Sequence, residues 1–452
     1  MQTILHDIPA HLIKLIEQLR DRLRDGDFLS RHRVRPEDFT RQCQLTFPVV
    51  MLFVLQKTVK SIQRHLHEFL SELAGGQLFE PVSAGAWTHA RAKLKHTAFI
   101  ELNQECVLPA FYGVERTDLQ RWRGHRLLGV DSSALRLPNQ EELGKEFGWM
   151  ESCNQRGATG IRYPEARISV LYDVLNRCGL DARLESNRCG EVSLAMEQAA
   201  QLQPGDVVLN DQGYTGYLYL AVVLKHGGHF IARCSTRSFL TAQELFRLNR
   251  ANRSRVVWLH ALPQQKAQCQ QLGLPLKIQV RFVSLRLPTG ELEVLATSLL
   301  DEALYPAEEF LTVYHWRWGH ETFHLMLKGR LDLENFSGLT VEAVRQDFHA
   351  AVLLCNLESI LSQPAEAELR QANTPGVRPV KLNRSVCYHA LKHDLLDLLY
   401  REIPAAEVIT RLMRLFQGAP VAMRPDRKPP KRRNASLNRS YHYLRRVKKI
   451  VF

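Results

Sequence analysis

The chain has 452 residues, enough for two or three domains with substantial cores, and its composition (45% hydrophobic, 24% charged) is ordinary for a globular protein. Its formal net charge of +13 favours a polyanionic partner such as nucleic acid. The longest apolar runs, such as Val49 to Leu55, are far shorter than the ~20 residues that cross a bilayer, so we expect no membrane partner. The first residues show no basic segment followed by an apolar core, which favours a cytoplasmic location.

Missing motifs exclude several common classes of enzyme. The nine cysteines include no Cys-x-x-Cys pair, which predicts buried free thiols rather than a structural zinc site or a disulfide framework. The sequence has no Gly-x4-Gly-Lys-Ser/Thr loop, so we expect no nucleotide cofactor. It also has no Gly-x-Ser-x-Gly elbow, which argues against a serine hydrolase.

Residues 1–120 are predicted to form a helical DNA-binding region. The helical periodicity covers four segments: Ile8 to Leu23, Pro48 to Lys57, Val59 to Leu73 and Ala84 to Leu94. A break rich in glycine and proline precedes the last segment and could join two helices of a helix-turn-helix. On this interpretation the last helix offers to a DNA groove the side chains of Thr88, Arg91, Lys93 and Lys95. The alternative is an ordinary helical bundle with a solvated basic face.

From about residue 121 the pattern becomes that of an α/β fold. Two short apolar strands, Arg126 to Val130 and Asp206 to Asn210, are each followed by an aspartate, Asp131 and Asp211. The segments between them predict strands at Arg167 to Leu175 and Leu180 to Glu185, then a helix from Glu191 to Leu202. Acids just beyond buried strands lie where an α/β sheet presents its active residues, although a single such aspartate is more often a cap or turn residue.

The rest of the chain alternates between β and helical patterns. Residues 235–300 predict a β-rich insertion with strands Val256 to Leu259, Leu276 to Leu285 and Glu291 to Ala296. One helix is expected to start near Pro306, and another to run from Val341 to about Leu361. Residues 366–452 are expected to be helical and then basic, because Arg424 to Lys449 holds eleven lysines and arginines against one acid. That run predicts a solvated tail that also contacts nucleic acid.

Within the helix near Pro306, four residues stand at offsets 0, 3, 7 and 14: Tyr314, Arg317, Glu321 and Lys328. In a continuous helix these offsets project within about 60° of one another. A carboxylate between cationic and aromatic groups suits a surface that holds a phosphodiester near a metal ion. The same segment spells His320-Glu321-Thr-Phe-His324, which matches the zinc-protease pattern, and Glu342 lies in range of a third ligand. Both interpretations use Glu321.

Asp131, Asp211 and Glu321 together form a candidate metal site. Mg²⁺ and Mn²⁺ prefer oxygen ligands, and two such ions about 3.5–4 Å apart can act on a phosphodiester. Three carboxylates from two strands and a helix can supply the oxygen ligands that such a pair needs. The sequence therefore predicts Mg²⁺ or Mn²⁺, as two ions, for the cofactor.

These motifs resemble those of the DDE transposases of bacterial insertion sequences, in particular the group with a Tyr-x2-Arg-x3-Glu-x6-Lys signature and a ribonuclease-H-like catalytic core. The matching stretches are Gly129-Val-Asp131-Ser-Ser with Leu135-Arg136, Asn210-Asp211-Gln-Gly-Tyr214, and Tyr314, Arg317, Trp318, Glu321 and Lys328. The resemblance runs through roughly 120–360 and implies a core in two parts, 121–234 and 301–365, around the insertion. His320 departs from it, since the group usually has an aliphatic residue there.

The resemblance implies that the acidic triad holds the metal while Tyr314, Arg317, Lys328 and Arg136 hold DNA. It implies binding to the terminal inverted repeats of a double-stranded element, cleavage of its ends and transfer of the 3′ strands, by a synaptic homodimer on the bacterial nucleoid. Related enzymes often place a flipped base on an aromatic side chain, for which Trp258 is the candidate. Two alternatives remain open: a catalytically silent DNA-binding derivative, and a zinc metallopeptidase that uses His320, Glu321 and His324.

Overall fold

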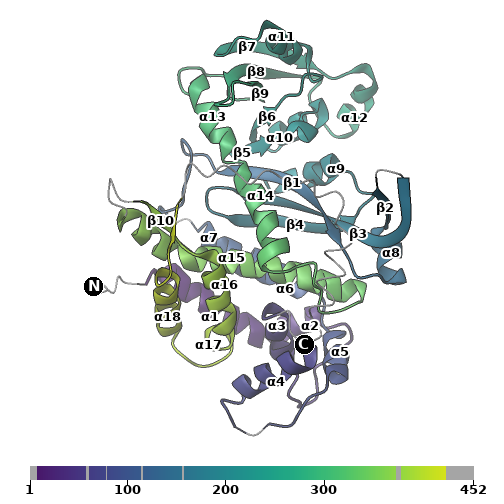
Figure 1. Ribbon diagram of the computed structural model, residues 1–452, viewed down its shortest axis with the longest axis vertical. Helices are drawn as coiled ribbons and strands as arrows, with labels where there is room; N and C mark the ends of the chain where they lie inside the picture. The colour runs from purple at the N-terminus through teal and green to yellow at the C-terminus, as the bar shows by residue number, and fades with distance from the viewer. Residues whose placement is uncertain are drawn as a thin grey trace. The chain divides into compact units, whose positions relative to one another are not determined.

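The computed structural model describes residues 8–57, 61–77, 79–113, 116–154, 157–372 and 378–423. The predicted basic tail from Arg424 to Lys449 therefore lies outside the described residues. The chain divides into two compact units, whose elements are labelled in Figure 1. Unit 1 comprises residues 1–116, 136–165 and 327–452, and unit 2 comprises residues 117–135 and 166–326.

Unit 1 is mainly helical. Its N-terminal helices are α1 (Ala10–Arg24), α2 (Gly26–His32), α3 (Phe47–Leu55), α4 (Ile62–Leu73), α5 (Ala84–Arg91), α6 (Thr97–Glu101), the π-type η1 (Leu102–Val107) and α7 (Leu108–Phe111). Its later elements are α8 (Glu141–Phe147), β2 (Trp149–Asn154), α15 (Val341–Ala372), β10 (Val380–Lys381), α16 (Arg384–His393), α17 (Leu395–Leu399), α18 (Ala405–Gln417) and β11 (Val421–Ala422). The four predicted N-terminal helices are confirmed, with ends shifted by a few residues.

The long helix α15 organises the core of unit 1. It packs against α3, α6, α16 and α18. Helix α3 has apolar residues on all sides, and every residue of it except Pro48 is buried, as expected for a helix in the middle of a bundle. Helix α1 buries one stripe instead, at Leu12, Leu15, Ile16, Leu19 and Leu23. The N-terminal and C-terminal parts of the chain therefore share a single hydrophobic core in this unit.

A buried ion cluster joins α5 to α15. Arg91 is only 4% exposed, and its Nη2 donates to Asp347 Oδ1 at 2.7 Å, while Lys57 Nζ lies 3.6 Å from Asp347 Oδ2. Burial alone would raise the pKa of Asp347, but Arg91 and Lys57 hold it below its ordinary value. Gln346, Ser337 and the carbonyl oxygen of Ala343 accept the other guanidinium hydrogen bonds. The prediction that Arg91 faces a DNA groove is therefore wrong, because its side chain points into the core of unit 1.

Unit 2 is built on a mixed sheet. Its strands are β1 (Leu127–Arg136), β3 (Gly157–Asp173), β4 (Cys178–Ser186), β5 (Val207–Asn210), β6 (His229–Arg233), β7 (Arg253–His260), β8 (Lys277–Arg286) and β9 (Leu292–Thr297). They lie in the order β4-β3-β1-β5-β6-β9-β8-β7. The first part of β3 belongs to unit 1, where it pairs with β2. Strands β1, β5 and β6 run parallel, and the pairs from β6 to β7 are antiparallel.

The helices of unit 2 lie between and after these strands. They are α9 (Glu191–Gln198), the 3₁₀ turns η2 (Ala199–Gln201), η3 (Gln212–Tyr214) and η4 (Pro263–Gln265), α10 (Tyr217–Lys225), α11 (Leu240–Leu248), α12 (Lys266–Gln271), α13 (Ala307–His315) and α14 (Trp318–Leu325). Helix α11 packs on β8 and β9, and α13 packs on β8 (Figure 1). The three predicted strands of the insertion are confirmed as β7, β8 and β9. They extend the main sheet, because β9 pairs with β6.

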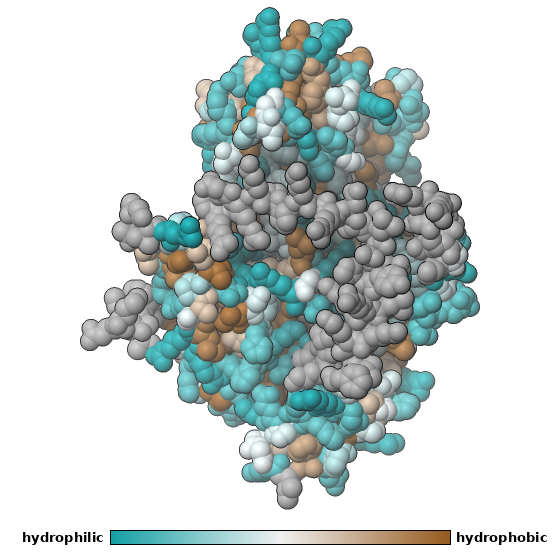
Figure 2. All heavy atoms as spheres, in the orientation of Figure 1, coloured by the Kyte–Doolittle hydropathy of each residue, from teal (hydrophilic) through white to brown (hydrophobic). Residues whose placement is uncertain are grey.

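The described surface is mostly hydrophilic on the face shown in Figure 2, with apolar residues scattered among polar ones. Among the described helices, none is long and apolar enough to cross a membrane. The described cysteines are free thiols, most of them buried, as the sequence predicts.

The buried cluster makes a testable prediction about Arg91. Removal of its guanidinium leaves Asp347 in the core with less compensating charge, so we expect Arg91→Ala to lower the free energy of unfolding by about 3–5 kcal/mol. Lys93→Ala is the matched control, because Lys93 is exposed, and should change stability by less than about 0.5 kcal/mol. Urea unfolding followed by circular dichroism measures both. Equal stability of the two variants would contradict the structural role of Arg91.

Candidate active site

Two of the predicted acids lie side by side on neighbouring strands of unit 2. Parallel pairing aligns Leu127 with Val207 and Gly129 with Leu209. The same register, continued by two residues, places Asp131 beside Asp211, on strands that run about 4.8 Å apart. Asp211 follows β5 directly, as predicted. Asp131 does not end its strand, because β1 continues to Arg136.

Local hydrogen bonds orient both carboxylates. Asp131 Oδ1 accepts from the backbone N–H of Ser132 at 2.8 Å, and Asp211 Oδ1 accepts from that of Gln212 at 2.8 Å, where Asp211 begins the turn η3. Burial raises the pKa of Asp131 to about 6, and the nearby charge of Asp211 adds to this effect. The two acids are therefore close enough to influence each other electrostatically, as a shared cation site requires.

The third acid lies on a helix that is less regular than predicted. The expected single helix from Pro306 is divided into α13 and α14 by a turn at Trp316 and Arg317, where backbone N–H groups bond three residues back instead of four. A π-type segment, η5 (Met326–Arg330), then contains Lys328. The backbone from Pro306 is therefore not the one regular helix that the sequence predicts, and Lys328 lies in the π-type segment beyond α14. The other three motif residues stay together.

Arg317 is the electrostatic centre of this group. It is 6% exposed, its Nη2 lies 3.3 Å from Glu321 Oε1, and its guanidinium lies 5.6 Å from the centre of the Tyr314 ring. Burial would lower the pKa of Arg317, but the neighbouring Tyr314, Asp211, Glu321 and Asp131 raise it. The guanidinium of Arg317 therefore interacts electrostatically with all three acids of the predicted triad. Tyr314 Oη completes the cluster with a long hydrogen bond of 3.5 Å to Asp211 Oδ1.

A fourth acid near this cluster was missed by sequence reasoning. Glu293, on β9, is 5% exposed, and its Oε2 lies 3.2 Å from Arg233 Nε. Burial raises the pKa of Glu293, and the charges of Arg233 and Arg317 oppose the rise. The sequence around Glu293 predicts a strand but does not mark this residue as part of the site, because only the pairing of β9 with β6 brings it there.

The two histidines of the zinc-protease pattern also lie in this region. Among the described residues, Asp131, His320 and His324 form a group whose potential ligand atoms all lie within 4.8 Å of one another. Asp211 and Glu321 are not members of that group. His320 Nε2 contacts the carbonyl oxygen of Val170 at 2.8 Å, and burial lowers the pKa of His320 to about 4, so its ring is neutral.

The third zinc ligand that the peptidase interpretation requires is engaged elsewhere. Glu342 accepts hydrogen bonds from the backbone N–H of His96 and contacts its Nδ1 at 3.0 Å, all within unit 1. Glu321 is paired with Arg317 and not with a histidine. Glu342, the third ligand that the peptidase interpretation names, and Glu321, its general base, therefore each have another partner.

The remaining predicted DNA contacts lie on different parts of the chain. Arg136, in unit 1, stacks its guanidinium 4.0 Å from the centre of the Tyr163 ring. Trp258, on β7, is 52% exposed, and Lys277 Nζ lies 4.9 Å above its ring. Thr88 and Lys93 are exposed. Trp258, Thr88 and Lys93 are therefore accessible, as a contact with DNA requires, whereas Arg136 is half-buried and Arg91 is buried.

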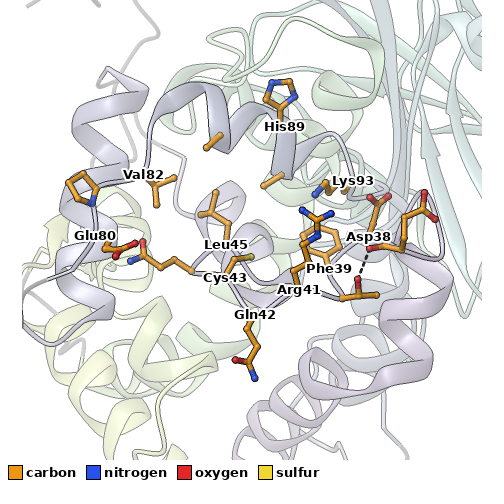
Figure 3. A pocket seen from close by; sticks show the side chains of 16 residues that line it. Asp38, Phe39, Arg41, Gln42, Cys43, Leu45, Glu80, Val82, His89 and Lys93 are labelled. Atoms are coloured by element: carbon orange, nitrogen blue, oxygen red, sulfur yellow. Dashed lines mark hydrogen bonds between the residues drawn. The ribbon is translucent and has the colours of Figure 1, made fainter.

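Lys93 also lines a cavity of about 850 Å³ in unit 1, between the end of α5 and the segment 37–45 (Figure 3). Its wall includes two cationic side chains, Arg41 and Lys93, together with His89. Three acids line it as well: Glu37, Asp38 and Glu80. The cavity is therefore of mixed charge and does not by itself mark an anion site.

Comparison with known proteins identifies the family. Residues 122–357, somewhat more than half of the chain, match the family described as the transposase DDE domain, and the chain belongs to this family. It is thus a transposase of the DDE class, whose members act in DNA recombination and generally use divalent metal ions. No curated protein sequence matches the chain. The piggyBac transposase in its synaptic complex with hairpin DNA is similar to it at a TM-score of 0.39 and 11% identity, over 88% of this chain and 87% of that chain.

The raised pKa of Asp131 predicts a stability change. Since the folded pKa is about 6 and the unfolded value about 3.9, the charged carboxylate destabilises the fold above pH 6, and this penalty vanishes below about pH 4. Asp131→Asn should therefore raise the thermal midpoint by a few degrees at pH 7.5, and the gain should disappear as the pH approaches 4. Differential scanning fluorimetry in metal-free buffer measures this shift.

Asp206→Asn is the matched control, because it breaks the buried pair between Asp206 and Arg126, whose atoms lie 2.6 Å apart. This variant should lower the midpoint at pH 7.5. A midpoint of Asp131→Asn below that of the unmodified protein at pH 7.5 would show that the charge of Asp131 is stabilising and would refute the prediction.

Proposed function

We propose that this protein is the transposase of a bacterial insertion sequence, which binds the terminal inverted repeats of its element, cleaves the ends and transfers the 3′ strands to target DNA. It would act on nucleoid DNA in the cytoplasm as a synaptic homodimer. Family membership and the clustering of three acids around Arg317 support this function. The mixed sheet with parallel β1, β5 and β6 supports a ribonuclease-H-like core.

Asp131, Asp211 and Glu321 are the residues that would hold Mg²⁺ or Mn²⁺, as two ions. Their oxygen donors suit these hard cations, and the like charges of the acids are offset in the structure by the Arg317 guanidinium. The chemistry that such ions supply when bound is activation of the attacking hydroxyl and stabilisation of the leaving oxygen. The hydrogen bonds from Ser132 and Gln212 keep the carboxylates of Asp131 and Asp211 oriented without rearrangement.

Arg317 would grip the phosphate next to the scissile bond. A guanidinium can donate two parallel hydrogen bonds to phosphate oxygens, and burial strengthens such contacts. Tyr314 orients Asp211 through its hydroxyl and packs beside Arg317. Lys328 and Arg136 would add point-charge and bidentate contacts along the DNA backbone. Trp258 would receive a flipped base, and its exposed ring on β7 is available for stacking.

Helix α5 and the turn that follows it would bind the end DNA, through Thr88 on the helix and Lys93 in the turn. The helix begins at a Ser83 cap, whose hydroxyl accepts from Ala86 N at 3.1 Å, and Thr88 and Lys93 are exposed. Arg91 has a structural role in this arrangement, because it anchors the opposite side of α5 to α15. The exposed side of α5 is therefore held rigidly, as a DNA-reading element requires.

Cleavage and binding of element-end DNA test this function together. With Mg²⁺ or Mn²⁺, we expect the protein to cut labelled end DNA, and we expect Asp131→Ala, Asp211→Asn and Glu321→Gln each to lower the cleavage rate by at least about 10²–10³-fold. DNA binding by these variants should stay nearly unchanged. Arg317→Lys should also reduce cleavage, since a lysine cannot reproduce the bidentate grip.

Binding without cleavage by the unmodified protein would identify a catalytically silent DNA-binding derivative. Near-normal cleavage by the Asp131→Ala variant would remove that residue from the metal site. Footprinting on the DNA that flanks the gene would identify the terminal repeats. DNA with these repeats is then the substrate for both assays.

The role of α5 makes a separate prediction about salt dependence. Replacement of Lys93 by alanine should weaken binding to all DNA sequences and reduce the slope of log K against log salt by about 1, the signature of one lost phosphate contact. Lys145→Ala is the matched control, because Lys145 is an exposed lysine of unit 1 on a different helix, α8. Fluorescence anisotropy over a salt series measures both slopes. Identical slopes for the two variants would show that Lys93 makes no phosphate contact.

A further inference from the structure

The proposed transposase function leaves His320 and His324 without a role. Both lie on α14 of unit 2, one helical turn apart, and both are buried, at 0% and 7% exposure. Together with Asp131 they bring their potential ligand atoms within 4.8 Å of one another. Two buried imidazoles beside the half-buried carboxylate of Asp131 form a candidate metal site, which adds two nitrogen donors to one acid of the triad.

A backbone hydrogen bond fixes the protonation pattern of His320. Because a carbonyl oxygen can only accept, the 2.8 Å contact between His320 Nε2 and Val170 O requires a hydrogen on Nε2. In the neutral ring the lone pair then lies on Nδ1. This Nδ1 is buried and has no hydrogen-bond partner among the described residues. Metal-binding histidines commonly donate their second ring N–H to a backbone carbonyl in this way.

Packing holds the His320 ring in this position. A Cβ at position 129 would come within 3.3 Å of His320 Cδ2, so Gly129 on β1 leaves the space that the ring occupies. The ring centroid of His320 lies 4.7 Å from that of His324 and 5.7 Å from that of Tyr172. The ligand atoms are therefore positioned by the fold before any ion binds, which reduces the entropy that binding would cost.

We propose that Asp131, His320 and His324 form a site for one divalent first-row transition-metal ion, such as Mn²⁺, Co²⁺ or Zn²⁺. Imidazole nitrogen is a good ligand for these ions, whereas Mg²⁺ prefers oxygen ligands and retains its waters. The site shares Asp131 with the proposed catalytic centre and takes its other two donors from α14. Its existence depends on this geometry and not on DNA cleavage.

Cobalt binding to the full-length, metal-free protein in the absence of DNA tests the site. In excess Mg²⁺, which fills oxygen-only sites such as the acidic triad, we expect one Co²⁺ per chain, with visible absorption bands typical of nitrogen coordination. His324→Ala and Asp131→Asn should each weaken Co²⁺ binding by at least about 10–100-fold, the loss seen when even an outer partner of a metal ligand is removed. Asp211→Asn is the matched control, because Asp211 lies outside the group, and it should retain the bands.

The Asp131→Asn variant keeps the test decisive, because the amide has nearly the size and shape of the carboxylate and so preserves the packing. The proposal is overturned if the unmodified protein binds no Co²⁺, or if His324→Ala and Asp131→Asn bind it as tightly as the unmodified protein. Loss of the bands in Asp211→Asn alone would assign Co²⁺ to the acidic triad and would equally overturn it. Since no DNA is present, failure of this titration and failure of the cleavage assay are separate results.

Discussion

A single buried guanidinium makes the acidic cluster of this protein possible. Carboxylates that approach one another repel, and burial in addition raises the pKa of Asp131. Arg317 offsets this repulsion because its charge reaches Asp131, Asp211 and Glu321 together. The same three acids compensate for the burial of the Arg317 charge. Without that charge the three acids would be a liability for the fold, and with it they remain ready for a divalent cation.

Much of unit 2 could be predicted from the sequence. Short apolar runs bounded by polar residues gave β5 with Asp211 at its end, and alternating or apolar patterns gave β7, β8 and β9. These features are local, so they can be read from a few neighbouring residues. The spacing of 80 residues between Asp131 and Asp211 carried no such signal. Only the parallel pairing of β1 with β5 explains why two residues 80 positions apart are neighbours.

The errors share one cause, which is dependence on distant parts of the chain. Arg91 looked like a DNA contact because its partner Asp347 lies 256 positions away. Glu293 was overlooked because a strand pairing brings it to Arg233 and Arg317. The helix with the transposase signature was predicted as regular, but its backbone tightens at Trp316 and Arg317. The histidines resembled a protease motif, and their surroundings show a different third neighbour, Asp131.

The composition of unit 1 has a consequence for the order of events during synthesis. Helices α3 and α6 pack on α15, and the charge of Arg91 is neutralised by a residue of that same helix. At roughly 5–20 residues per second, the ribosome needs on the order of 10–50 s to add the 256 residues that separate Arg91 from Asp347. Until then the N-terminal helices expose the apolar faces that α15 covers. Arg91 also lacks the carboxylate that neutralises it in the core, so these helices cannot reach their final packing. The first hundred residues thus depend on α15 for their final packing.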